Sequence, residues 1–270
     1  MIDARFTLFA HLIDDAGLFP PARKPMERAI SDHRLARAGA HAWILGRFLC
    51  PVSRFDELTV DDGWDLGAIF DGADWHADLE RVQSYSGPGV IRVLELRAPA
   101  DQAAAADALI ATGAAVFFEL PGADALAGLP RSVGAKLRCG GPTAAAFPSP
   151  AAVAGFIATA RHLGVRFKLT AGLHHPFRTR DKQLGVLQHG FINLLAATAI
   201  DVADLEAVVA EPRPEAFHVD RHGLRWGDAS AGPRELAGAR LHFTAYGSCS
   251  FDEPVADLVA AGILTAPTHA

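Results

Sequence analysis

Short apolar runs alternate along the chain with longer stretches in which apolar positions recur every three or four residues. The short runs, rich in β-branched and aromatic residues, predict eight strands at residues 5–12, 41–49, 65–71, 89–97, 114–120, 133–138, 165–170 and 239–247. The longer stretches predict helices, the clearest at 25–39, 73–85, 101–113 and 149–164. Strands that alternate with helices indicate a parallel sheet.

Eight such strands are the number that closes a (β/α)8 TIM barrel, and we expect one α/β domain over residues 1–270. An open, doubly wound sheet is the alternative. It would be expected to carry a glycine-rich phosphate turn, and neither GxGxxG nor GxxxxGK[ST] occurs in the sequence. About 70 residues separate the seventh and eighth strands. We interpret 199–238 as an insertion there, with a β-hairpin at 216–228 that could act as a lid or an interface.

Composition narrows the class of partner. The net charge of −6 and pI near 6.0 disfavour a nucleic-acid binder. Three cysteines without a CxxC pair indicate a reducing compartment, and neither a signal peptide nor a membrane-length apolar run is evident. We therefore expect a cytoplasmic protein that acts on a small anionic molecule, binds neither nucleic acid nor membrane, and could form a homo-oligomer.

Two lysines carry the candidate chemistry. Only four of the 25 cationic residues are lysines, and Lys136 and Lys168 lie inside predicted strands. Side chains two residues apart on a strand lie on the same face, so Lys136 shares a face with Arg138, and Lys168 shares a face with Thr170. Both lysines should point into the barrel. Neighbouring cations lower each other's proton affinity, which favours a neutral amine that can form a Schiff base. Alternatively, each lysine pairs with a buried carboxylate.

Acidic and basic residues in or near the ends of other predicted strands are further candidates for the site. Glu119 ends the fifth predicted strand and is either a general acid/base or an ion-pair partner of Arg138 or Lys136. Weaker candidates at other strand ends are Asp15, Arg47, Asp71, Glu95 and Arg97.

The loops after the last two strands predict an anion site. In many barrels these loops hold a phosphate with backbone N–H groups. The expected substrate-binding residues are Arg138, Thr170, Gly172, His174, His175, Arg178, Gly247, Ser248 and Ser250. A carboxylate would use the same groups.

A scattered metal site is the competing interpretation. Twelve histidines are present, but HExxH and HxH are not. The candidate ligands are His11, His174, His175, His189, Glu119 and Cys249. The leading interpretation assigns no metal and no cofactor.

The segments AKLRCGG, FKLTAGLHHP and YGSCSF resemble the lysine and phosphate motifs of the deoxyribose-phosphate aldolase family, over roughly 114–175 and 245–251. The resemblance implies a TIM barrel, a Schiff-base lysine at Lys136, a second lysine at Lys168, and phosphate contacts at Gly247, Ser248 and Ser250. Arg138 departs from the pattern, since the family has a small hydroxyl residue there. The AGLHHP and GSCSF segments also resemble a bacterial protein family whose activity is uncharacterised.

The sequence thus predicts a class I aldolase-type lyase that forms an imine at Lys136 with a small phosphorylated or carboxylated carbonyl compound. A metal-dependent barrel hydrolase or lyase, and a non-catalytic anion-binding barrel, are the alternatives.

Overall fold

The computed structural model describes residues 3–266, and its centre is a closed barrel of eight parallel strands. The strand order around the barrel is β1-β13-β7-β6-β5-β4-β3-β2. The strands are β1 (Ile13–Asp15), β2 (Leu45–Pro51), β3 (Asp65–Ile69), β4 (Val90–Arg97), β5 (Ala115–Leu120), β6 (Gly134–Arg138), β7 (Phe167–Thr170) and β13 (Phe243–Ser248). The predicted TIM barrel is therefore confirmed.

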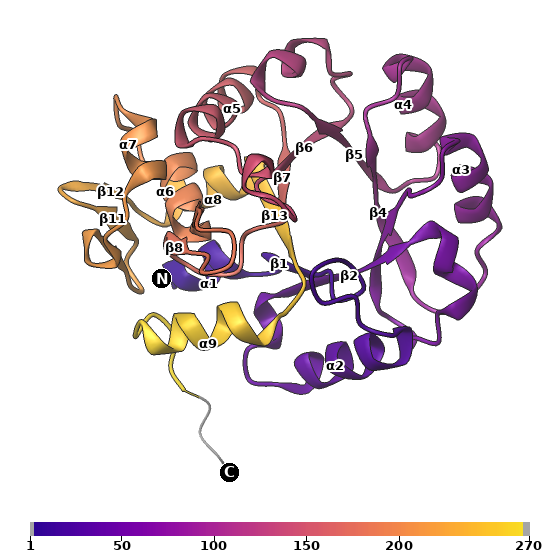
Figure 1. Ribbon diagram of the computed structural model, residues 1–270, viewed down its shortest axis with the longest axis horizontal. Helices are drawn as coiled ribbons and strands as arrows, with labels where there is room; N and C mark the ends of the chain where they lie inside the picture. The colour runs from indigo at the N-terminus through magenta and orange to yellow at the C-terminus, as the bar shows by residue number, and fades with distance from the viewer. Residues whose placement is uncertain (1–2, 267–270) are drawn as a thin grey trace.

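Helices lie outside the ring of strands (Figure 1). The longer ones are α2 (Met26–Ala38), α3 (Trp75–Ser84), α4 (Gln102–Ile110), α5 (Pro150–Leu163), α8 (Pro233–His242) and α9 (Asp252–Ala260). Short 3-10 turns, η2 (Val52–Glu57) and η3 (Ala123–Gly128), take the place of helices after β2 and β5. Helix α5 begins where the sequence favours it, since the Ser149 hydroxyl accepts a hydrogen bond from the Ala152 amide and Pro150 occupies the first turn. The remaining short turns are η1 (Ala42–Ile44), η4 (Ala144–Ala146) and η5 (Pro214–Ala216).

The first predicted strand is wrong, and the last predicted strand begins too early. Residues 5–12 do not form a strand; most of them lie in helix α1 (Ala4–Phe9), which packs against α8. Its buried residues Ala4, Leu8 and Phe9 follow a helical spacing, and the Asp3 side chain caps its first turn. The first barrel strand is instead the three-residue β1. Likewise, the segment from 239 to 242 completes α8, and β13 begins only at Phe243.

The chain between β7 and β13 forms a separate layer of small elements on one side of the barrel (Figure 1). It holds the two-stranded β8–β9 sheet (Thr179–Arg180, Leu187–Gln188), then α6 (Phe191–Ala199) and α7 (Leu205–Ala210). A three-stranded sheet follows, formed by β10 (Phe217–Val219), β11 (Leu224–Trp226) and β12 (Ala229–Ala231). The hairpin predicted at 216–228 corresponds to the antiparallel pair β10–β11. Helix α6 is buried on every side, which explains its uniformly apolar sequence.

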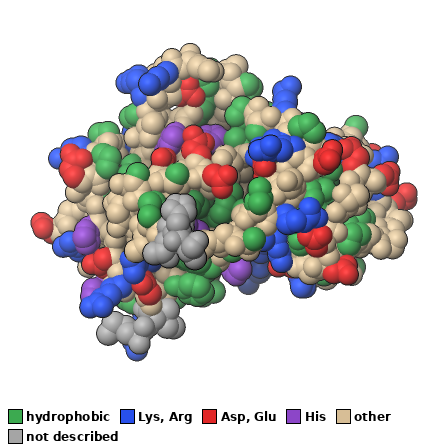
Figure 2. Space-filling model, turned by 90° about the horizontal axis from the view of Figure 1, so that it is seen from below, with side chains coloured by type: hydrophobic (Ala, Val, Ile, Leu, Met, Phe, Trp, Pro, Cys, Tyr) green, Lys and Arg blue, Asp and Glu red, His purple; other side chains and the backbone are tan. Residues whose placement is uncertain are grey.

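Successive side chains of β6 and β7 point alternately towards the surrounding helices and into the barrel. Leu137, Phe167 and Leu169 are buried in the core between strands and helices, while Lys136 and Lys168 point to the barrel interior. On the outer surface, Lys and Arg side chains are interspersed with Asp and Glu over the face in Figure 2. None of the helices within residues 3–266 combines the length and apolarity needed to cross a bilayer.

Candidate functional site

A cavity of about 620 Å³ opens where the strands end. Ile69, Arg97, Arg138 and Thr170 line it, and each is the last residue of its strand. Residues of β2 and of the loops after β1, β3 and β4 also line it. This is the end of a barrel at which TIM-barrel enzymes build their active sites, and the volume suits a small ligand.

Lys168 anchors a buried charge network beneath the cavity. Its Nζ donates to Oδ2 of Asp14 at 2.5 Å and to Oε1 of Glu95. All three side chains are at most 2% exposed. Asp14 is held in addition by the backbone N–H of Arg47 at 2.8 Å, with the Arg47 guanidinium 3.4 Å away. Gly46 permits this approach, because a Cβ there would lie 2.3 Å from Asp14 Oδ1.

Lys136 sits between two carboxylates on neighbouring strands. Its Nζ lies 2.9 Å from Oε2 of Glu95 and 3.4 Å from Oε2 of Glu119. The strand register explains the proximity, since Glu119 is paired with Lys136 and Lys136 with Lys168. Lys136 lines the cavity, whereas Lys168 does not. The two lysines therefore differ in access to a ligand.

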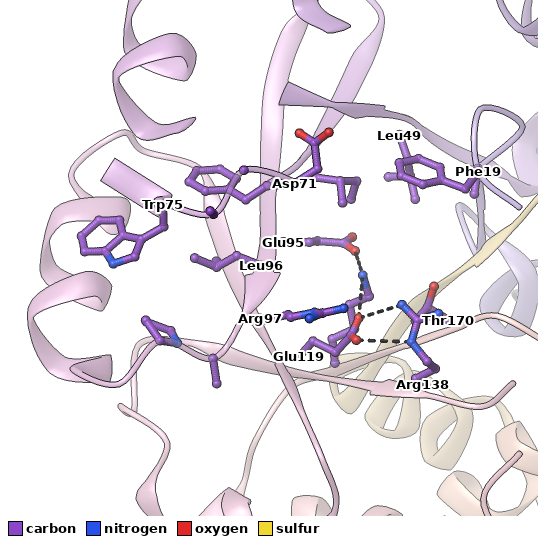
Figure 3. Close-up of a pocket in the computed structure, with 18 residues that line it drawn as sticks. Phe19, Leu49, Asp71, Trp75, Glu95, Leu96, Arg97, Glu119, Arg138 and Thr170 are labelled. Atoms are coloured by element: carbon purple, nitrogen blue, oxygen red, sulfur yellow. Dashed lines mark hydrogen bonds and ion pairs between the residues drawn. The ribbon is translucent and has the colours of Figure 1, made fainter. Parts of the chain in front are cut away.

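The rim above Lys136 carries Glu119 between two arginines. The Arg138 guanidinium makes two long contacts to Glu119, at 3.3 Å and 3.5 Å, and half of its side chain is exposed. Arg97 is paired with Glu119 in the strand register and lines the same cavity. Figure 3 draws these three side chains close together, with dashed lines that join Glu119 to Arg138 but not to Arg97.

Neighbouring charges shift the pKa values of the buried residues Glu95 and Lys168. Burial raises the pKa of Glu95, but the positive charges of Lys136 and Lys168 outweigh it and bring that pKa to about 2. For Lys168, burial lowers the pKa, but the carboxylates of Asp14 and Glu95 raise it overall. The protonated form of Lys168 is therefore favoured, contrary to the expectation that both lysines lose proton affinity.

The predicted anion loops lie apart from this cluster. Of those residues, Arg138 and Thr170 line the cavity. Gly247 lies behind its wall, since a Cβ there would lie within 3.7 Å of Ala16, Leu49 and Thr170, which all line the cavity.

The remaining loop residues make contacts within the protein. His175 Nδ1 lies 2.6 Å from Asp257 on α9, and Arg178 donates to the carbonyls of Ala210 and Leu187. The Ser248 hydroxyl donates to the carbonyl of Ser250 at 2.6 Å.

Gly172 has a packing role after β7. It has a φ of 70°, and a Cβ there would approach Phe147 to 2.9 Å and the Cys139 carbonyl to 3.0 Å. Glycine at this position therefore allows the loops after β6 and β7 to touch.

The candidate metal ligands are spread out. His11 contacts the Leu45 carbonyl and His189 that of Pro148. Cys249 Sγ lies 3.8 Å from His174 Nδ1, but burial raises the pKa of that thiol and lowers the pKa of the histidine. Between residues 3 and 266, no three His, Cys, Asp or Glu side chains are arranged to hold a metal ion.

Sequence reasoning underrated two members of the network. The sequence pointed to Asp15 and not to Asp14, but Asp15 contacts His33 Nδ1 at 2.9 Å. Glu95 ranked only as a weak candidate. The available signal was its position as the one acidic residue inside the apolar run VLEL, where a buried carboxylate requires a buried cation.

Comparison with known proteins gave no match, whether with protein-family models, curated proteins or solved structures.

Proposed function

We propose that the protein is a lyase of the class I aldolase type, in which Lys136 forms an imine with the carbonyl group of a small substrate. The observation that carries this proposal is the different position of the two lysines. Lys136 lines the cavity, whereas Lys168 does not and is held beneath it by Asp14 and Glu95. The resemblance to the deoxyribose-phosphate aldolase family supports the same assignment.

Imine formation needs Lys136 without its proton, and the network can tolerate that loss. Glu95 would keep the Lys168 ammonium as its counter-charge when Lys136 becomes neutral. Glu119, 3.4 Å from the Lys136 nitrogen, is placed to accept the proton.

The reaction then follows from the imine. The Lys136 nitrogen attacks the carbonyl carbon, Glu119 returns the proton that it took from Lys136, and the carbonyl oxygen leaves as water. This gives a protonated imine and a free Glu119 carboxylate. Removal of a proton from the β-hydroxyl by Glu119 breaks the adjacent carbon–carbon bond, and the bonding electron pair moves into the protonated imine. The resulting enamine takes up a proton at carbon, and water then releases the second product and restores Lys136.

Borohydride reduction tests the proposal, because it converts an imine to a stable amine. The wild-type protein should gain the mass of a reduced adduct with members of a panel of aldehydes, ketones, 2-oxo acids and sugar phosphates. Lys136→Arg should keep the charge and the fold but gain no adduct. Lys182→Arg, at an exposed lysine, is the matched control and should label like the wild type. Equal labelling of Lys136→Arg would refute the assignment.

A further inference from the structure

We propose that the carbonyl substrate is a 2-oxo acid, whose carboxylate binds Arg138 beside the imine and whose remaining chain lies against an apolar wall of the cavity. This inference rests on the imine at Lys136 proposed above and specifies what that imine is made from. It moves the anion site from the loops after β7 and β13 to the ends of β4 and β6.

The distance between Lys136 and Arg138 is the first argument. Lys136 Nζ and an Arg138 terminal nitrogen both contact the same oxygen, Oε2 of Glu119, at 3.4 Å and 3.5 Å. The two nitrogens are therefore at most about 7 Å apart. In an imine of a 2-oxo acid, a carboxylate oxygen lies about 3 Å from the imine nitrogen, and a guanidinium hydrogen bond adds about 3 Å more. A carboxylate on the carbon next to the carbonyl thus bridges this gap, while an anion several bonds further away would overshoot Arg138.

The charge at the rim is the second argument. Two guanidinium groups, those of Arg97 and Arg138, flank the single carboxylate of Glu119. The contacts between Arg138 and Glu119 are long, and half of the Arg138 side chain is exposed. A guanidinium group offers five donors in a planar fork, so Arg138 can hold Glu119 and still present donors to a second carboxylate. Arg97 supplies further positive charge close by.

The apolar wall is the third argument. Phe19, Leu49, Phe70 and Trp75 line the cavity around the charged centre. Figure 3 places Phe19 and Leu49 together on one side and Trp75 on the other. A cavity of about 620 Å³ exceeds the needs of a three-carbon acid. The part of the substrate beyond the reacting carbons is therefore apolar, and aromatic side chains suit an aromatic or branched aliphatic group.

The reaction class follows and balances. In a 4-hydroxy-2-oxo acid, Lys136 condenses with C2 and releases water. Glu119 takes the proton of the 4-hydroxyl, the C3–C4 bond breaks, and C4 leaves as an aldehyde. The electron pair forms an enamine, which is protonated at C3 and hydrolysed to a shorter 2-oxo acid. The reaction consumes no oxidant or reductant.

Paired probes that differ only in the carboxylate test the inference. Phenylpyruvate and phenylacetone share the benzyl group and the ketone, and dihydroxyacetone phosphate supplies a phosphate instead. The rate of borohydride-trapped adduct formation is measured for the wild type, Arg138→Leu and Arg92→Leu. Arg92 lies on the same strand as Arg97 but at the opposite end, in an exposed pair with Asp65, and serves as the control.

We expect Arg138→Leu to lower the ratio of the phenylpyruvate to the phenylacetone labelling rate at least about tenfold, the usual order for losing a charged hydrogen bond. The ratio cancels any effect that losing the contact between Arg138 and Glu119 has on imine formation itself. Arg92→Leu should match the wild type. Should the leucine variant not fold, Arg138→Gln makes the same comparison. An unchanged phenylpyruvate-to-phenylacetone ratio in the Arg138 variant overturns the inference, as does preferential, Arg138-dependent labelling by dihydroxyacetone phosphate. In both cases the imine at Lys136 stands. Absence of labelling by every carbonyl compound instead overturns the imine, and the inference with it.

Discussion

Removing the Lys168 ammonium should destabilise the protein by about 3 kcal/mol. Lys168→Met keeps the apolar stem but leaves Asp14 and Glu95 buried without their shared cation. Breaking a buried ion pair from one side costs about 3–5 kcal/mol. We expect the lower end of this range because both carboxylates retain another contact. Glu95 still has Lys136 Nζ at 2.9 Å, and Asp14 still accepts a hydrogen bond from the Arg47 backbone amide at 2.8 Å.

Urea unfolding followed by circular dichroism at pH 7 measures this loss, and the melting temperature should fall by roughly 6–12 °C. Lys24→Met is the control, since Lys24 pairs with Asp32 at 2.9 Å near the surface, where such a pair contributes about 1 kcal/mol or less. Adding Glu95→Gln to Lys168→Met should recover part of the lost stability, because it removes one of the two carboxylates that no longer contact Lys168. A Lys168→Met variant no less stable than the Lys24 control would refute the buried network.

Three further outcomes follow from the same structure. The pKa of Glu95 is about 2, against an ordinary 4.5, so the ionised carboxylate contributes stability that is complete above about pH 4.5 and is lost as the pH falls towards 2. In urea titrations at several pH values, the stability of a Glu95→Gln variant should therefore fall less steeply with acid than that of the wild type. Gly46→Ala would place a Cβ 2.3 Å from Asp14 Oδ1 and should cost about 1–3 kcal/mol in urea unfolding, while Gly238→Ala in α8, with open space around it, should be neutral or slightly stabilising. With a thiol reagent, Cys249 should react first and the other two cysteines only on unfolding, because those two are fully buried; simultaneous reaction of all three would contradict the packing.

The barrel and its inward lysines could be predicted because both depend on local patterns. Period-two alternation places Lys136 and Lys168 on one face of two successive strands, and successive strands with a helix between them are neighbours in a parallel barrel. The same logic brought Glu119 beside Lys136. These predictions needed no knowledge of distant contacts.

The partners of Lys168 could not be found in this way, because they come from far along the chain. Asp14 is 154 residues away, and it reaches Lys168 only because β1 closes the barrel against β13. Placing the first strand at 5–12 put Asp14 in a loop, since the aromatic residues of α1 mimic a strand. The contacts of Arg178 could not be predicted for a related reason: its guanidinium donates to carbonyls of the segment between β7 and β13, whose path the sequence pattern does not give.

Peptide mapping of the borohydride-reduced adduct tests the central claim most directly. It asks which lysine of the wild-type protein carries the added mass after reduction in the presence of a carbonyl compound. The proposed imine at Lys136 predicts a single modified peptide, bearing the adduct on Lys136. Lys168 should stay unmodified because it does not line the cavity and is held by two carboxylates. An adduct on Lys168, or one distributed over surface lysines with none on Lys136, would contradict the assignment.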